Sequence, residues 1–82
     1  MDNGSEKEII AELVRHLKVL RLRKGLSHNK LSLLAGITRP AVSQIESGKR
    51  IPTMLLCLKI ARALGKNLSD ILAKCERKIY KS

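Results

Sequence analysis

Residues 27–47, SHNKLSLLAGITRPAVSQIES, decide the fold, because they predict two short helices joined by a turn at Gly36. Ser27 can cap the first helix and Thr38 the second, since a side-chain oxygen there accepts a hydrogen bond from a first-turn N–H group. Glycine adopts the left-handed conformation that ends many helices at little cost. Helices this short are unstable alone in water, so they must pack at a steep angle against another element.

The apolar spacing predicts which face of each short helix is buried. Leu31, Leu34 and Ala35 share one face of the first helix, and Val42 and Ile45 share one face of the second. A helix-turn-helix unit presents its second helix outward. The opposite face of that helix carries polar or small side chains suited to contacting base edges, namely Arg39, Pro40, Ser43 and Gln44.

The flanking sequence predicts three more helices, so we expect an all-α, compact, five-helix domain. Residues 1–4 are expected to be disordered, and the further helices to span 5–24, 53–64 and 67–80. Aliphatic residues at helical spacing should form the core: Leu13, Leu17 and Leu20; Met54, Cys57, Leu58, Ala61 and Leu64; Leu68, Ile71 and Leu72. A chain of 82 residues makes a single domain over 1–82.

The charge distribution points to a polyanionic partner. The net charge is +10, and residues 15–66 contain twelve Lys and Arg but only one acid, Glu46. Such a basic surface is typical of proteins that bind nucleic acid.

Other composition features exclude several function classes. No apolar run approaches the ~20 residues of a membrane span, and the start MDNGSEKE is unlike a secretory signal, so we expect a cytoplasmic protein. Cys57 and Cys75 lack metal-ligand spacing and are expected to be reduced thiols, with no metal and no cofactor. Neither His16 nor His28 has an acid and a nucleophile at a catalytic spacing, which argues against an enzyme.

Three stretches resemble the phage-repressor-like (Xre-type) helix-turn-helix family, which includes phage repressors, Cro and restriction-modification controller proteins. They are LKVLRLRKGLS (17–27), LSLLAGITRPAVSQIESGKRIP (31–52) and LKIARALGKNLSDIL (58–72). The resemblance implies a lambda-repressor-like domain whose third helix lies in the major groove of double-stranded DNA. It also implies a salt bridge between Arg21 and Glu46.

The same resemblance implies contacts to the DNA backbone. His28 stands where the family has a phosphate-contacting Gln, although a surface histidine without a special role is the alternative. Backbone contacts are further expected from the loop after the third helix, through its amides and cations. The full set of expected phosphate contacts is Ser27, His28, Asn29, Thr38, Lys49, Arg50 and, more weakly, Ser47 and Arg21.

Surplus apolar residues predict a homodimer. Ile9, Ile10 and Val14 exceed what the family domain needs, and they can pack either on their own core or against another chain. The expected interface is centred on the fifth helix and consists of Leu55, Leu56, Cys75, Ile79 and Tyr80, flanked by Ile9 and Ile10.

The function that follows is a sequence-specific regulator of transcription, for instance a repressor, acting as a homodimer on a palindromic operator. One alternative is an antitoxin that binds both DNA and a toxin protein, and another is a co-activator adaptor. RNA polymerase is a further candidate partner. We expect no effector domain, and the sequence accordingly implies no small-molecule ligand.

Overall fold

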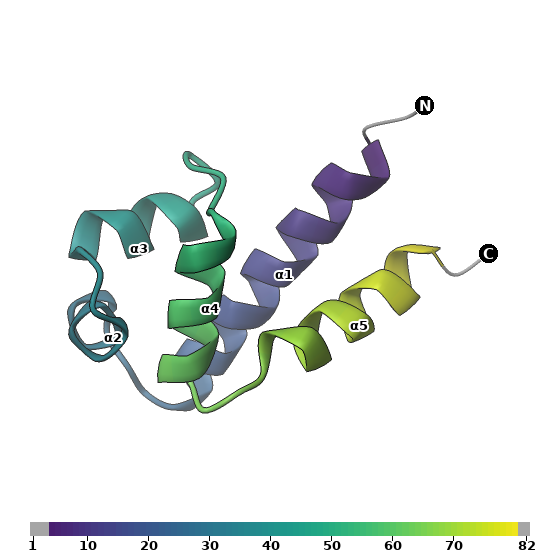
Figure 1. Cartoon of the computed structure of the whole chain (residues 1–82). Coiled ribbons are helices and arrows are strands. Elements are labelled where there is room, and N and C mark those ends of the chain that lie inside the picture. The colour runs from purple at the N-terminus through teal and green to yellow at the C-terminus, as the bar shows by residue number, and fades with distance from the viewer. Residues whose placement is uncertain (1–3, 81–82) are drawn as a thin grey trace.

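The computed structural model describes residues 4–80 and folds them into five α-helices without a β-strand (Figure 1). The helices are α1 (Gly4–Arg23), α2 (His28–Ala35), α3 (Arg39–Glu46), α4 (Met54–Ala63) and α5 (Leu68–Tyr80). Gly4 is the first residue of α1, so its assignment to a disordered start was wrong. The rest of that expected disordered segment, residues 1–3, lies outside the described residues.

The helix-turn-helix forms through the local signals that the sequence predicts. The Ser27 hydroxyl accepts a hydrogen bond from the Lys30 amide at 3.0 Å, and the Thr38 hydroxyl accepts one from the Ala41 amide at 3.2 Å. Gly36 has a φ of 71° and ends α2 in the left-handed conformation. The Ser27 cap begins α2, whereas Gly36 and the Thr38 cap set the turn between α2 and α3.

The buried faces of two helices agree only in part with the sequence prediction: Leu31 of α2 and Cys57, Ala61 and Leu64 at α4 are buried as expected, but other predicted core residues are not. On α2, Ser32 is buried beside Leu31, whereas Leu34 is 54% exposed. On α4, Ile60 is buried, whereas Met54 is 64% and Leu58 49% exposed. Both errors arise because the core covers only a narrow sector of each helix, so that apolar residues at its edge face the solvent.

The N-terminal half of α1 and the C-terminal half of α5 run side by side, so that the start of α1 and the end of α5 lie at the same end of the molecule (Figure 1). We call residues 4–16 and 72–80 the two-helix arm, and residues 17–71 the body. The Glu12 carboxylate of α1 lies 3.0 Å from Lys78 Nζ of α5, and this ion pair joins the two helices of the arm. The same carboxylate lies 2.6 Å from Arg15 Nη2 within α1.

The arm buries two residues that the sequence analysis assigned to a dimer interface. Ile9 is 9% exposed and Cys75 is fully covered, and both belong to the core of the single chain. Their assignment to the interface was therefore wrong, because α1 and α5 cover each other's apolar faces. Cys57 and Cys75 are both buried free thiols, and burial raises the pKa of each.

None of the helices within residues 4–80 has the length and continuous apolar character needed to cross a bilayer. The same residues contain no group of three or more His, Cys, Asp or Glu side chains arranged to hold a metal ion.

Candidate nucleic-acid interface

The outer face of α3 is polar and accessible, and its inner face anchors the helix. Ala41, Val42 and Ile45 are buried in the core. The four predicted base-contacting residues, Arg39, Pro40, Ser43 and Gln44, are all exposed. Pro40 lies in the first turn, where its missing N–H removes no hydrogen bond from the helix. The structure therefore presents these four side chains together on one rigid, solvent-facing surface.

A buried ion pair fixes α3 relative to α1. Arg21 donates from Nε and Nη2 to the two carboxylate oxygens of Glu46, at 2.7 and 2.9 Å. Burial raises the pKa of Glu46, but the hydrogen bonds from Arg21 and His28 outweigh it and hold the pKa below its ordinary value. A paired carboxylate with two donors stays ionised at neutral pH, so this connection between the helices is permanent there.

Most of the donors of Arg21 are used within the chain. Its third nitrogen, Nη1, donates to the carbonyl of Leu26 at 2.6 Å, and the residue is only 7% exposed. Three of its five N–H groups join α1, α3 and the segment before α2, so a contact from Arg21 to a phosphate stays a prediction and the weakest of the set.

A polar hollow of about 310 Å³ lies where α1, α2 and α3 meet. Its lining is Arg21, Ser27, His28, Asn29 and Arg39. The N-terminal turn of α2 is also here, and helix N-termini favour anions through their free N–H groups and dipole. The hollow thus combines cationic side chains, hydrogen-bond donors and a helix end, an arrangement suited to a phosphate group.

His28 has a specific partner in this hollow. Its Nε2 lies 3.0 Å from Glu46 Oε1, which makes His28 part of the same network as Arg21. Sequence reasoning missed this hydrogen bond, because the two residues lie in different helices and nothing in their spacing connects them. The contact gives His28 a structural role beside Glu46, whereas its contact to a DNA phosphate stays a prediction.

The loop after α3 offers cations but not free amides. The amides of Lys49 and Arg50 both donate to the carbonyl of Gln44, at 3.0 and 3.2 Å, and the Ser47 hydroxyl donates to the same carbonyl at 3.1 Å. The expected phosphate contacts from these amides were therefore wrong. The side chains of Ser47, Lys49 and Arg50 remain exposed, as does Thr38 at the other end of α3.

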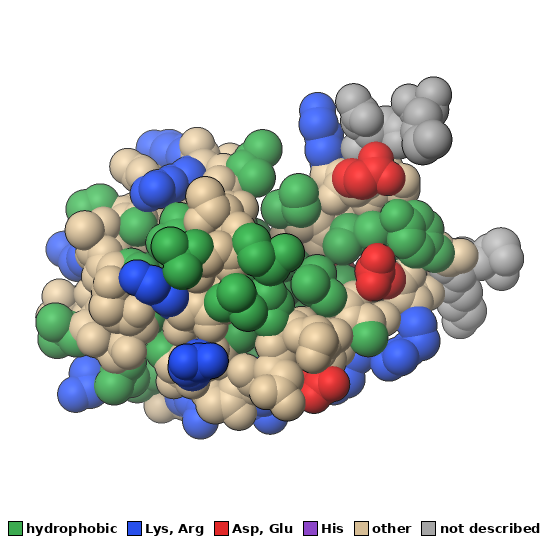
Figure 2. All heavy atoms as spheres, viewed as in Figure 1, with side chains coloured by type: hydrophobic (Ala, Val, Ile, Leu, Met, Phe, Trp, Pro, Cys, Tyr) green, Lys and Arg blue, Asp and Glu red, His purple; other side chains and the backbone are tan. Residues whose placement is uncertain are grey.

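The acidic side chains are concentrated at one end of the molecule, whereas basic side chains occur at both ends. In the view of Figure 2, acidic side chains appear only toward the side of α5 and the arm, whereas Lys and Arg side chains surround the helix-turn-helix. The ends of α3 are thus flanked by the polar hollow on one side and by Lys49 and Arg50 on the other.

Comparisons with known proteins agree with this geometry. The sequence model of a family described as "Helix-turn-helix" matches residues 17–71. The chain is 42% identical over 55 residues to an uncharacterized HTH-type transcriptional regulator, YgzD, of Bacillus subtilis, covering 67% of this chain and 83% of that protein. It is 33% identical to an uncharacterized HTH-type transcriptional regulator of Haemophilus influenzae, over 80% of this chain and 67% of that protein. It is 30% identical to the HTH-type transcriptional regulator PuuR of Escherichia coli, over 77% of this chain and 34% of that protein. No solved structure gives a significant match.

Proposed function

Because the chain belongs to the helix-turn-helix family, whose sequence model matches residues 17–71, we propose that it is a DNA-binding regulator of transcription. In this proposal it binds double-stranded DNA sequence-specifically, as a homodimer on a palindromic operator, in the cytoplasm. The observation that carries the proposal is the outer face of α3, where Arg39, Ser43 and Gln44 stand exposed on a helix held by a buried ion pair.

The side chains of α3 are suited to reading bases in the major groove. Arg39 can donate two hydrogen bonds to guanine O6 and N7, and Gln44 can pair with adenine N6 and N7. Pro40 offers only apolar contact, which suits a thymine methyl group. Ser43 can donate to or accept from a base edge. The rigid attachment of α3 favours such readout, because side chains that are already positioned lose less freedom on binding.

Residues on both sides of α3 can contact phosphates of the DNA backbone. The polar hollow with Ser27, His28 and Asn29 would take one phosphate, and Lys49 and Arg50 would pair with others. Ser47 and Thr38 are weaker candidates, because each hydroxyl already makes a hydrogen bond within the chain. Such contacts set the position of α3 in the groove without reading the sequence.

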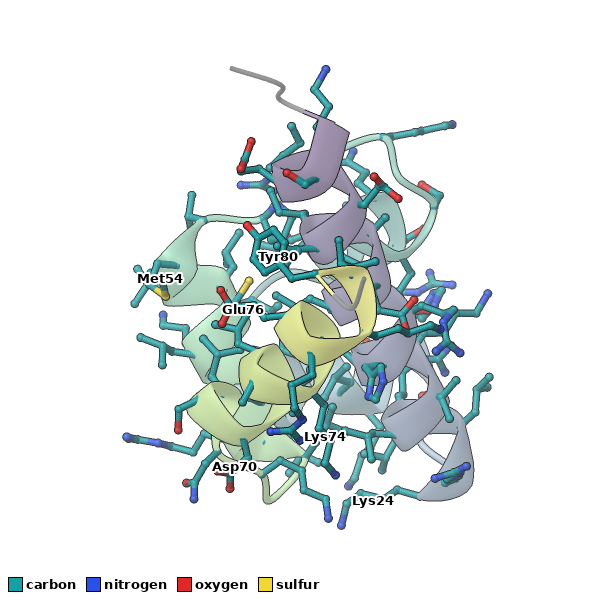
Figure 3. All side chains as sticks on the ribbon, turned by 90° about the vertical axis from the view of Figure 1, so that its right-hand side faces the viewer. Lys24, Met54, Asp70, Lys74, Glu76 and Tyr80 are labelled. Atoms are coloured by element: carbon teal, nitrogen blue, oxygen red, sulfur yellow. The ribbon has the colours of Figure 1, made fainter. Side chains whose placement is uncertain are left out.

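An exposed apolar patch on α4 supports the dimer. Met54, Leu55 and Leu58 are all exposed on one side of α4, and Tyr80 at the end of α5 is 55% exposed. Figure 3 shows Met54 and Tyr80 on the faces of α4 and α5 that meet the solvent. Leu56, Ile79 and Ile10 are half-buried and can only border such an interface. A two-fold dimer built here would need its two α3 helices about one DNA turn, ~34 Å, apart.

Selection of binding sites from random duplex DNA tests the readout. The native chain should enrich one motif with two-fold symmetry. Arg39→Ala and Gln44→Ala should each lose preference at a single base position, at a cost of ~1–3 kcal/mol in binding. If both variants selected the native motif unchanged, α3 would not be the reading element.

Sedimentation equilibrium tests the dimer. The native chain should sediment as a dimer at micromolar concentration, and the variant Leu55→Asp, Leu58→Asp should be monomeric. Both positions are exposed, so the substitutions should leave the fold intact. A folded variant that still dimerises would place the interface elsewhere.

A further inference from the structure

A second, mostly apolar pocket of about 570 Å³ separates the outer face of α1 from the loop between α3 and α4. Ile10 and Val14 line it from α1, and Ile45, Ile51 and Pro52 line it from the other side. In Figure 2, hydrophobic side chains border the hollow between this loop and the N-terminal half of α1. Its volume falls in the range of ~300–1,000 Å³ that is usual for small-molecule sites.

Most of one wall lies outside the part of the chain that matches the family model. Lys7, Ile10, Ala11 and Val14 precede residue 17, where the match begins. They recur at helical spacing along one face of α1, and from residue 7 to residue 18 that face is about 16 Å long. The apolar surplus in this part of α1 is therefore not fully used by the core, since Ile10 and Val14 remain half-buried. It forms an elongated groove instead.

The lining carries cations that have no carboxylate partner among residues 4–80. Lys7, Lys18 and Arg50 contribute to the pocket and form no ion pair with described residues. Arg15 is also present, but its guanidinium is paired with Glu12. The one acid of the lining, Glu46, is neutralised by Arg21. The pocket thus combines an apolar body with unpaired positive charge.

We propose that this pocket binds a small amphipathic carboxylate, in which an aliphatic body lies along Ile10 and Val14 and the carboxylate pairs with Arg50 and Lys18. The chemistry of both parts is matched: apolar surface is removed from water, and an anion meets unpaired cations while the one acid of the lining, Glu46, is already paired with Arg21. A phosphate group of DNA would satisfy the cations but would leave the apolar lining uncovered.

The proposed ligand would act on DNA binding through Arg50, which rests on the function proposed above. Arg50 cannot pair with a ligand carboxylate and with a DNA phosphate at the same time. The amides of Lys49 and Arg50 are also bonded to the carbonyl of Gln44, so the loop and the end of α3 are mechanically connected. Ligand and DNA should therefore weaken each other's binding, by the same factor in both directions.

An NMR titration of the DNA-free chain with octanoate tests the pocket itself. Octanoate should cause saturable shifts of amides in residues 7–18 and 45–52, and it should bind at least about ten-fold more tightly than 1-octanol or octylammonium. Arg50→Gln and Lys18→Gln should weaken octanoate binding, whereas Lys66→Gln, an exposed lysine beside α5, should not. Ala11→Trp should fill the groove and abolish binding while the remaining amide spectrum stays native.

Unsaturable shifts, equal binding of 1-octanol, or shifts centred on Met54 and Leu58 would overturn the pocket assignment.

A DNA-binding titration with and without octanoate tests the coupling between the pocket and DNA. Saturating octanoate should weaken DNA binding by roughly ten-fold in the native chain and not at all in Ala11→Trp, which should bind DNA normally. Unchanged DNA affinity in the octanoate-bound native chain would overturn the coupling. Failure to bind any DNA would instead contradict the proposed function, and leave the pocket to be judged by the DNA-free titration.

Discussion

Glu46 in the body and Glu12 in the arm each join α1 to a second helix, but their surroundings differ. Glu46 pairs with Arg21, and both side chains are only 9% exposed. Glu12 is also largely covered, at 11%, but its partners Arg15 and Lys78 are 55% and 59% exposed. Solvent screens the second pair and mobile side chains weaken it further, whereas the first is protected from both.

The pKa of each of the two carboxylates is lowered, but the balance of causes differs. The hydrogen bond from Arg15, followed by that from Lys78, lowers the pKa of Glu12 to about 2. For Glu46, burial works in the opposite direction and the bonds from Arg21 and His28 must overcome it. The comparison teaches that one carboxylate between two helices can produce a rigid connection in the body and an adjustable one in the arm, depending on how exposed its partners are.

Removing the buried partner should have the largest effect. Arg21→Ala leaves the Glu46 carboxylate buried without its main donor, and should lower the free energy of unfolding by ~3–5 kcal/mol, as measured by urea denaturation. The matched change in the arm, Lys78→Ala, should lower it by less than ~1 kcal/mol. Similar losses for the two variants would erase the distinction between the two regions.

His28 should have an intermediate effect, since Glu46 keeps Arg21 when His28 is lost. His28→Ala should reduce the free energy of unfolding by about 1 kcal/mol. It should also weaken DNA binding for all sequences alike, because the polar hollow loses a donor. Denaturation and DNA titration on the same samples check both effects, and a variant as unstable as Arg21→Ala would mean that His28 carries part of the buried connection.

The body and the arm should also differ in their contribution to salt dependence. Lys49→Gln should flatten the slope of log affinity against log salt concentration by about one unit, since one phosphate contact is lost. Lys78→Gln removes the same charge from the arm and should leave the slope unchanged, apart from a small long-range effect. DNA titrations between low and moderate salt measure both slopes; equal flattening would extend the DNA-binding surface onto the arm.

The smallest effect is expected from acid titration of Glu12. Its pKa is depressed in the folded chain, so its stabilising contribution is present above the ordinary value of 4.5 and is lost as the pH falls toward 2. The native chain should therefore lose stability across this window, and Glu12→Gln should lose less. Thermal unfolding at several pH values between 5 and 2 compares the two chains, and parallel curves would show that the ion pairs of Glu12 with Arg15 and Lys78 contribute nothing.

The sequence by itself determined the helix-turn-helix and the polar character of the outer face of α3. Ser27, Thr38 and Gly36 act through hydrogen bonds and backbone preferences within a few residues, so their effects can be predicted without knowing the rest of the fold. The same holds for the outward polar face of α3, because burial of Val42 and Ile45 leaves only one other face to the solvent. The match to the family model over residues 17–71 agrees with the resemblance that the motif implied.

Only the tertiary structure decided how contacts distant in the sequence are shared out. Cys75 and Ile9 are buried in the chain's own core, and the amides of Lys49 and Arg50 are hydrogen-bonded to the carbonyl of Gln44. His28 contacts Glu46, and Lys78 contacts Glu12. Helical spacing tells which residues share a face, but not which neighbouring helix covers that face or how wide the covered sector is. Those depend on the angles and distances between helices, which are set by the packing of the whole core.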